Sequence, residues 1–223
     1  MKVSGSKNNF SVLSETGASS RDRLLESAGV LFAAKGFREV SVREIAAHAG
    51  VNSALVGYYF RGKQALFNEV YRSYAAPLAH ERMKRLAAIG KSRRASVEEV
   101  LKAWLIPWLQ LDGTGKNVLH VHFMANLSAE RWEHTEKASA FTSRTHNAFI
   151  KVLQDCLPHL SRETLIWRLH FLVGAIAFGI RFPGPLKAVS KGCCDPHDFA
   201  AVFDQILPYA VAGFCAPEPS HRT

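Results

Sequence analysis

The sequence predicts an all-α protein of about nine helices. Apolar residues recur at the i, i+3, i+4 and i+7 positions through most of its 223 residues, which is the spacing of one helix face. Two S-x-x-E sequences, Ser41 to Glu44 and Ser96 to Glu99, have the spacing of a capping box at a helix start. No stretch shows the alternation of apolar and polar residues that is typical of a half-buried strand.

The first helix is expected to follow a disordered arm. Residues 1–19 are rich in Ser, Gly and Asn and lack an apolar stripe. A stripe of leucine, alanine and phenylalanine then runs from Ser20 to Lys35, and Gly36 ends it. The sequence therefore predicts a helix over residues 20–35.

Two short helices joined by a tight turn are predicted next. The capping box at Ser41 begins the first, and Gly50 stands where a helix end favours a positive φ. Asn52 is a strong N-cap residue, so a second helix is expected over about residues 53–59. A helix, a glycine turn and a second helix form the helix-turn-helix unit, whose second helix enters the major groove of DNA.

The matching residues of this stretch are Val42-Arg43-Glu44-Ile45-Ala46, Ala49-Gly50-Val51-Asn52, Tyr58-Tyr59-Phe60 and Lys63. In this pattern the chain resembles the DNA-binding module of the TetR family of one-component transcriptional regulators. The resemblance implies a DNA-binding domain over residues 20–66. It also implies a helical effector-binding and dimerisation domain over residues 67–216, which leaves a tail over residues 217–223.

The expected DNA contacts lie on and beside the second helix of this unit. By helical spacing, one exposed face of that helix is expected at the base edges, and it includes Gly57, where many family members carry a larger side chain. This glycine indicates either a close approach of the backbone to DNA or an unconstrained exposed position. The resemblance implies that Tyr59 and Lys63 bind phosphates. The residues assigned to DNA are Arg43, Asn52, Ser53, Ala54, Gly57, Tyr58, Tyr59 and Lys63.

The charge distribution favours a polyanion as partner of this N-terminal part. The formal net charge is +9, and all of the excess lies before residue 95. Part of it lies just beyond the helix-turn-helix, in a cluster expected on a solvated surface or loop. The members of that cluster are Arg82, Lys84, Arg85, Lys91, Arg93 and Arg94.

The rest of the chain is expected to form helices only. A long helix over residues 63–89 connects the two domains, with a kink or break at Pro77. The next begins at Ser96, and others are expected over residues 116–127, 129–157 and 161–182, before a last helix with Asp195 as N-cap and Pro196 as its first residue.

Large apolar side chains with several histidines suggest a ligand site between the body helices. Each residue alone is more typical of an ordinary core. The family resemblance implies that a small hydrophobic or amphipathic effector binds among them. The residues assigned to this site are Trp104, Trp108, His120, Phe123, Met124, Phe141, Trp167, His170 and Phe171.

The helix over residues 161–182 is apolar almost all round, so it has to be covered on every side. We expect its own subunit to cover one side and a second copy of the chain to cover the other. The last two helices would then form a two-fold, four-helix interface. The residues assigned to this interface are Leu165, Leu169, Leu172, Val173, Ile176, Phe199, Val202, Phe203 and Ile206.

Other classes of site find little support. Cys193, Cys194, Asp195 and His197 form a compact donor cluster, but its spacing is not the C-x₂-C spacing of metal sites, so we expect neither a metal nor another cofactor. Neither a nucleophile elbow, nor a phosphate-binding glycine loop, nor an H-E-x-x-H sequence is present. The apolar run over residues 171–180 is shorter than a membrane span requires.

These features predict a cytoplasmic, homodimeric regulator, most simply a repressor, that binds palindromic half-sites in double-stranded DNA and is released by an effector. Reduced cysteines and the lack of a signal peptide favour the cytoplasm. The alternatives are a DNA-binding regulator without an effector and, as a different class, an enzyme whose active site carries no known motif.

Overall fold

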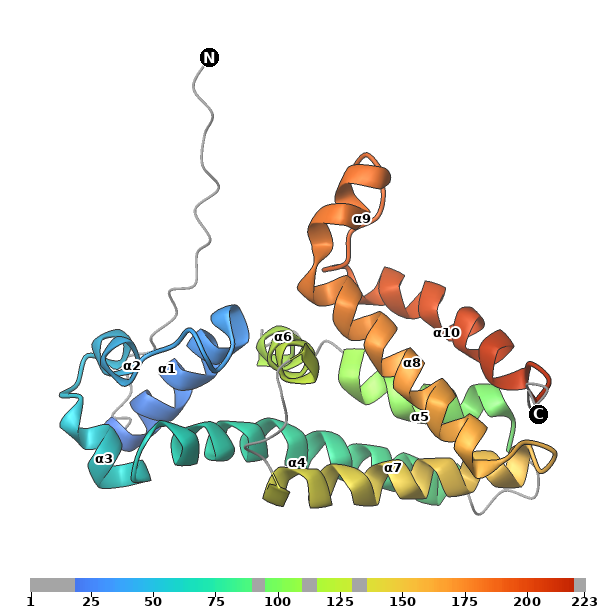
Figure 1. Cartoon of the computed structure of the whole chain (residues 1–223), viewed down its shortest axis with the longest axis horizontal. Helices are drawn as coiled ribbons and strands as arrows, with labels where there is room; N and C mark the ends of the chain where they lie inside the picture. The colour runs from blue at the N-terminus through green and yellow to red at the C-terminus, as the bar shows by residue number, and fades with distance from the viewer. Residues whose placement is uncertain (1–18, 90–94, 110–115, 130–135, 219–223) are drawn as a thin grey trace, which may run out of the picture.

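The computed structural model describes residues 19–89, 95–109, 116–129 and 136–218, apart from the side chains of residues 116–118, 127–129 and 136–142. Every regular element within these ranges is a helix, as Figure 1 shows. The predicted all-α class is therefore confirmed. The predicted arm, except for Ser19, and most of the predicted tail lie outside the described residues.

The described ranges contain ten helices, one more than expected. The additional helix is α9, which starts at Pro183, where the sequence indicated only a break. A proline at the first helical position loses no helical hydrogen bond, so it can begin a helix as well as end one. The helices are α1 (Ser20–Lys35), α2 (Val42–Ala49), α3 (Ala54–Phe60), α4 (Lys63–Ile89), α5 (Val97–Leu109), α6 (Lys116–Ala129), α7 (Glu136–Cys156), α8 (Arg162–Arg181), α9 (Pro183–Val189) and α10 (Phe199–Cys215).

The start of α10 differs from the prediction. Asp198, rather than Asp195, caps the helix, and its Oδ1 accepts from the backbone N–H of Ala201 at 3.0 Å. Asp195 instead accepts from the backbone N–H of His197 at 3.1 Å and closes a turn. Two aspartates three residues apart offer the same local signal, and Phe199, which is fully buried at the first helical position, favours the later start.

Helices α1, α2 and α3 form a small head whose ends are capped as the sequence predicted. Ser41 Oγ accepts from the N–H of Glu44 at 3.1 Å, and Gly50 ends α2 with a φ of 63°. The carboxylate of Glu44 pairs with Lys35 at the end of α1. The core of the head extends into the first half of α4 and includes Phe123 of α6.

Helix α4 is the long connection between head and body. It runs without interruption through Pro77, where a kink or break was expected. Pro77 and Ser73 are both exposed, so the Ser73 carbonyl that lacks a helical donor lies on the solvent side, where water can bind it. The head and the body are therefore joined by one continuous helix.

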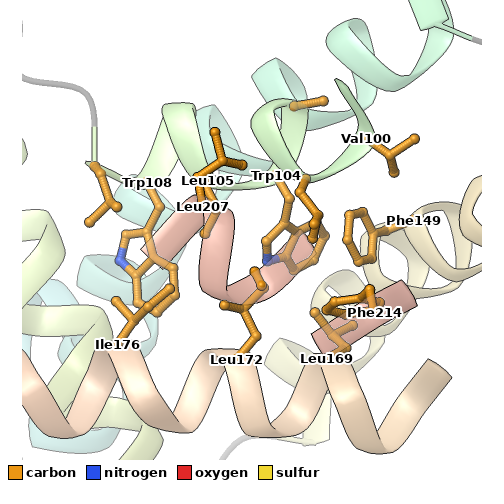
Figure 2. Packing of buried hydrophobic residues seen from close by; sticks show 14 of the residues in the cluster. Val100, Trp104, Leu105, Trp108, Phe149, Leu169, Leu172, Ile176, Leu207 and Phe214 are labelled. Atoms are coloured by element: carbon orange, nitrogen blue, oxygen red, sulfur yellow. The ribbon is translucent and has the colours of Figure 1, made fainter. Parts of the chain in front are cut away.

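The body core lies between α5, α8 and α10, with α7 against its other end. Figure 2 shows Trp104 and Trp108 of α5 facing Leu169, Leu172 and Ile176 of α8. Helix α6 lies between α1 of the head and α8 of the body (Figure 1), and it contacts both. Helix α8 is the one helix of the described residues that is long and apolar enough to cross a membrane. Core helices of soluble proteins often share this property, and 39% of the apolar stretch of α8 is buried.

Candidate nucleic-acid interface and effector site

The exposed face of α3 carries the residues predicted to contact base edges. Ser53, Ala54 and Gly57 are exposed, and Tyr58 is the most exposed aromatic residue of the head at 78%. Val56 and Phe60 point the other way and are buried in the head core. The amphipathic division of this short helix therefore agrees with the prediction, while the contacts themselves remain a prediction.

Asn52 acts within the protein, one residue before Ser53, which is the N-cap of α3 and makes no capping bond with its own side chain. The Oδ1 of Asn52 accepts from the backbone N–H of Ala54 at 2.8 Å and so begins α3. The residue remains exposed, and its side-chain amide nitrogen is not used in this bond. Asn52 therefore fixes the direction in which α3 leaves the turn.

Gly57 is not required by the packing of the protein. A Cβ atom built at this position would meet no other heavy atom within 4 Å. The residue lies inside α3, where glycine is less favourable than alanine by about 1 kcal/mol. The structure is therefore compatible with both interpretations of Gly57, close approach to DNA and an unconstrained exposed position.

The elements next to α3 in the chain carry three cations. Arg43 is exposed at the start of α2, and Lys63 is half-buried at the start of α4, where its Nζ lies 4.2 Å from the centroid of the Phe37 ring. Arg61, which the sequence analysis did not select, is exposed in the turn between α3 and α4 with a φ of 60°. The signal for Arg61 was its position as a basic residue between the aromatic pair and Lys63.

The nine residues assigned to an effector do not form one site. Trp104, Trp108 and a mostly buried His120 lie together in the body, whereas Phe123 belongs to the core cluster of the head and half-buried Met124 touches both clusters. Trp167, His170 and Phe171 lie on the outer surface of α8, with Trp167 54% and Phe171 63% exposed. They are therefore not part of an enclosed site within one chain, and the Phe141 side chain lies outside the described residues.

Arg82 is the most unusual residue of this region, and its burial was not predicted. Arg82, expected on a solvated surface, is only 7% exposed and lies over the Trp104 ring, with its Cζ 3.7 Å from the ring centroid. Its Nε donates to the Trp104 carbonyl at 3.0 Å. Among the described residues no carboxylate pairs with it. Burial lowers its pKa to about 9, so it remains a cation at neutral pH.

Three further nitrogens near Arg82 are buried without a hydrogen-bond partner among the described residues. They are Nε1 of Trp104, Nε1 of Trp108 and Nε2 of His120. Burial, and then the charge of Arg82, lower the pKa of His120 to about 4, so this imidazole is neutral at pH 7. A buried polar group without a partner is uncommon because it costs about 1–3 kcal/mol. The region therefore combines one cation with several unsatisfied polar groups.

The outer side of α8 is an aromatic stripe. Trp167, Phe171 and Phe178 are all more than half exposed and follow one another at the spacing of a single helix face. By contrast, Leu165, Leu169, Leu172 and Ile176 are buried within the chain's own core, as Figure 2 shows for the last three. The choice of these residues, and of buried Phe199, for contact with a second chain is therefore corrected. Val173, Val202, Phe203 and Ile206 are partly buried against the same core.

The cysteine cluster has little metal-binding character. Cys193 and Cys194 are exposed, and their sulfurs lie 4.0 Å apart. In the described part of the chain, no group of three or more His, Cys, Asp or Glu residues has a geometry suited to a metal ion. The Asp195 carboxylate is close to Lys187, which lies 3.6 Å away.

Comparison with known proteins connects these two regions to one family. Residues 24–70 match the model of bacterial regulatory proteins of the tetR family, and residues 102–213, half of the chain, match the model of the tetracyclin repressor-like C-terminal domain. The chain is 40% identical over 88 residues to a probable HTH-type transcriptional regulator, YttP, of Bacillus subtilis. It is 32% identical over 81 residues to the HTH-type transcriptional repressor KstR2 of Rhodococcus jostii.

These alignments cover 38% and 36% of this chain, and the chain spans only about 40% of the length of either relative. The fold is similar over a greater length. A probable transcriptional regulatory protein, RHA5900, superposes over 88% of this chain and 100% of its own, with a TM-score of 0.60 at 20% identity. A putative regulator from Saccharomonospora viridis, solved with choline, superposes over 85% of this chain and 96% of its own, with a TM-score of 0.56 at 18% identity. The head, the body and both family models agree, and the chain belongs to the TetR family of bacterial transcriptional regulators.

Proposed function

We propose that this chain is a homodimeric, cytoplasmic repressor that binds palindromic half-sites in double-stranded DNA and is released when a small amphipathic effector binds in its body. The observation that carries the DNA-binding part is the exposed face of α3. It presents Tyr58 to solvent, and the elements next to α3 in the chain carry the cations Arg43, Arg61 and Lys63. An exposed aromatic residue flanked by cations suits a helix that enters a groove between two phosphate backbones.

Tyr58 and Lys63 should have different effects on DNA binding. We expect Tyr58→Ala to weaken binding and relax sequence preference, since a base-edge contact carries sequence information. Lys63→Met keeps an aliphatic side chain against the Phe37 ring but removes the charge, so it should weaken all duplexes alike and reduce the salt dependence.

The experiment is a selection from random duplexes, followed by titration of the selected duplex at several salt concentrations. If the dimer neutralises about eight phosphates, log K should fall with log salt with a slope near −7. Tyr58→Phe is the matched control for loss of the ring. The assignment of roles is refuted if Tyr58→Ala and Lys63→Met change every sequence equally, and the proposal itself is refuted if no duplex is preferred.

The aromatic stripe of α8 supports a second copy of the chain as its partner. Trp167 and Phe171 stack on each other with centroids 5.6 Å apart, yet both remain more than half exposed. An exposed apolar stripe of this kind is typical of a protein interface. Phe171→Glu should therefore give a monomer by light scattering, whereas Phe171→Tyr should remain a dimer. A dimeric Phe171→Glu protein would contradict this interface.

A regulator without an effector is the alternative, and the buried polar groups around Arg82 argue against it. A body that served only to pair two heads would gain nothing from an unpaired buried cation. The alternative predicts that no small molecule releases the selected duplex.

A further inference from the structure

The Arg82 region has the chemistry of an anion-binding site. The guanidinium is 7% exposed, and the one hydrogen bond that the described residues make to it uses Nε. The donors on its other two nitrogens have no partner among those residues, and neither of these nitrogens is among the fully buried atoms that lack one. A buried cation normally has a carboxylate beside it, because taking the charge out of water is otherwise very costly.

The guanidinium and indole groups of this region require an acceptor rather than another donor. Guanidinium and indole N–H groups donate and cannot accept. The Nε1 atoms of Trp104 and Trp108 are buried without partners, and the Cζ of Arg82 lies 3.7 Å and 5.8 Å from the centroids of these two rings. His120 is neutral at pH 7, since its pKa is lowered to about 4, so Arg82 is the one buried side chain of the described residues that carries a permanent positive charge. One negative charge on an acceptor group matches this set.

We propose that Arg82 binds the carboxylate of the effector, with the Trp104 and Trp108 indoles and the aliphatic residues of α8 packed against the apolar part of the same molecule. This inference rests on the proposed function and names the chemical class of the ligand. A carboxylate has two oxygens in the plane of the guanidinium fork, so it can accept two parallel N–H bonds. A phosphate dianion would bring a second negative charge that no other buried cation of the described residues balances.

A purely structural role for Arg82 predicts something different. In that case the guanidinium would act as a clamp between α4 and α5, through its ring contact and its bond to the Trp104 carbonyl. An apolar side chain of similar length would hold the same two helices without burying a charge. The stability of the ligand-free Arg82→Met protein therefore separates the two roles.

The test uses the full-length protein and two sets of probes, each with a common tail. The first set is decanoate, decanol and decylamine, and the second is 4-phenylbutyrate, 4-phenylbutanol and 4-phenylbutylamine. Binding is measured by calorimetry and by the shift in Tm. We expect at least one acid to bind, with the alcohol and amine of the same tail about tenfold or more weaker.

Arg82→Met should lose the preference for the acid and should unfold at a Tm no lower than that of the wild type. Arg85→Met is the matched control. Arg85 lies on the same helix, is part-exposed and pairs with Glu81 at 2.8 Å, so its loss should leave acid binding unchanged.

The proposal is overturned if neither acid binds, if alcohols or amines bind as tightly as acids, or if Arg82→Met keeps the preference for acids. A lower Tm of Arg82→Met together with unchanged acid binding would establish the structural role. Because acid binding is measured without DNA, failure of the proposed function has a separate signature. A protein that binds acids through Arg82 but prefers no duplex would refute repression and leave this inference standing.

Discussion

His120 should make the protein less stable as the pH falls from 7.5 to 5.5. Burial first, and the charge of Arg82 second, lower the pKa of this histidine from 6.5 to about 4 in the folded chain. Between pH 7.5 and pH 5.5 the His120 side chain therefore binds more protons in the unfolded state than in the folded state. The contribution of His120 to stability is therefore fully present above pH 6.5 and is lost as the pH falls through 6.5 towards 4.

The magnitude follows from the same two values. Each pKa unit corresponds to about 1.4 kcal/mol, so the difference between 6.5 and 4 gives a total of about 3 kcal/mol. At pH 5.5 only the first part of this interval has been crossed. We therefore expect the free energy of unfolding to fall by about 1 kcal/mol between pH 7.5 and pH 5.5 on account of His120 alone.

The assay is urea unfolding at both pH values and at one protein concentration, because the stability of a dimer depends on concentration. His120→Gln should lose about 1 kcal/mol less than the wild type over this interval. His80→Gln, at an exposed position of α4, is the control and should follow the wild type. Burial also lowers the pKa of His122, but His122 is present in all three proteins. Equal losses in the wild type and His120→Gln would refute the reasoning.

Two further predictions concern the turn after α2 and the contact between α6 and the head. Gly50→Ala should lower the free energy of unfolding by about 1–2 kcal/mol, since the φ of 63° disfavours a side chain and the new Cβ would lie 2.6 Å from Nη2 of Arg23. Urea unfolding measures this loss, and an unchanged midpoint would contradict the prediction. Gly57→Ala, the matched control, should raise stability by up to about 1 kcal/mol, and it should weaken DNA binding only if the backbone of α3 approaches the bases closely. Asn126→Leu removes the amide that donates to the Ala33 carbonyl at 2.6 Å and that a shift of α6 would have to break, so the effector should release DNA at a lower concentration in a titration of the DNA-bound protein. Release at the same concentration as in the wild type would argue against this contact as a restraint on the shift.

The head could be predicted almost entirely from the sequence because its signals are local. Ser41, Gly50 and Asn52 each act on a backbone group within four residues; the first two act as predicted, and Asn52 acts one residue before the N-cap of α3, Ser53. The same holds for Ser96 and Glu99, whose reciprocal bonds begin α5. Capping is determined by short stretches of sequence, so no tertiary information is needed.

The exposed face of α8 could not be predicted in the same way. Leu169 and Phe171 are both apolar and lie two positions apart, yet one is 4% exposed and the other 63%. A helix without a polar face gives no signal for its orientation. Which side of α8 is buried depends on the helices that pack against it, α6, α7 and α10, and the residue order within α8 does not encode their positions.

Arg82 was mispredicted for a related reason. It stands among basic residues, and such clusters are usually solvated. It is buried because Trp104, which lies 22 positions later, covers its guanidinium. The same tertiary contact that concealed Arg82 from sequence reasoning also makes it the strongest candidate for a ligand contact in the described residues.

Helix α6 explains how a ligand near Arg82 can affect the head. It carries His120 beside the Arg82 region, Phe123 in the head core and Asn126 at the end of α1. The Asn126 amide donates to the Ala33 carbonyl, and its oxygen accepts from Arg181 at the end of α8. A shift of α6 away from α1 therefore has to break a buried hydrogen bond between head and body.

Breaking that bond costs about 1–3 kcal/mol, which is the size of a typical coupling free energy between two sites. An effector can shift the head only if its affinity for the two positions of α6 differs by at least this amount. A carboxylate held by Arg82 on α4, with its apolar part packed against α5 and α8, fulfils this condition if the ligand also changes the contact of α6 with α8, because it would then bind elements that move relative to α6. The regulatory movement is therefore expected where α6 meets α8.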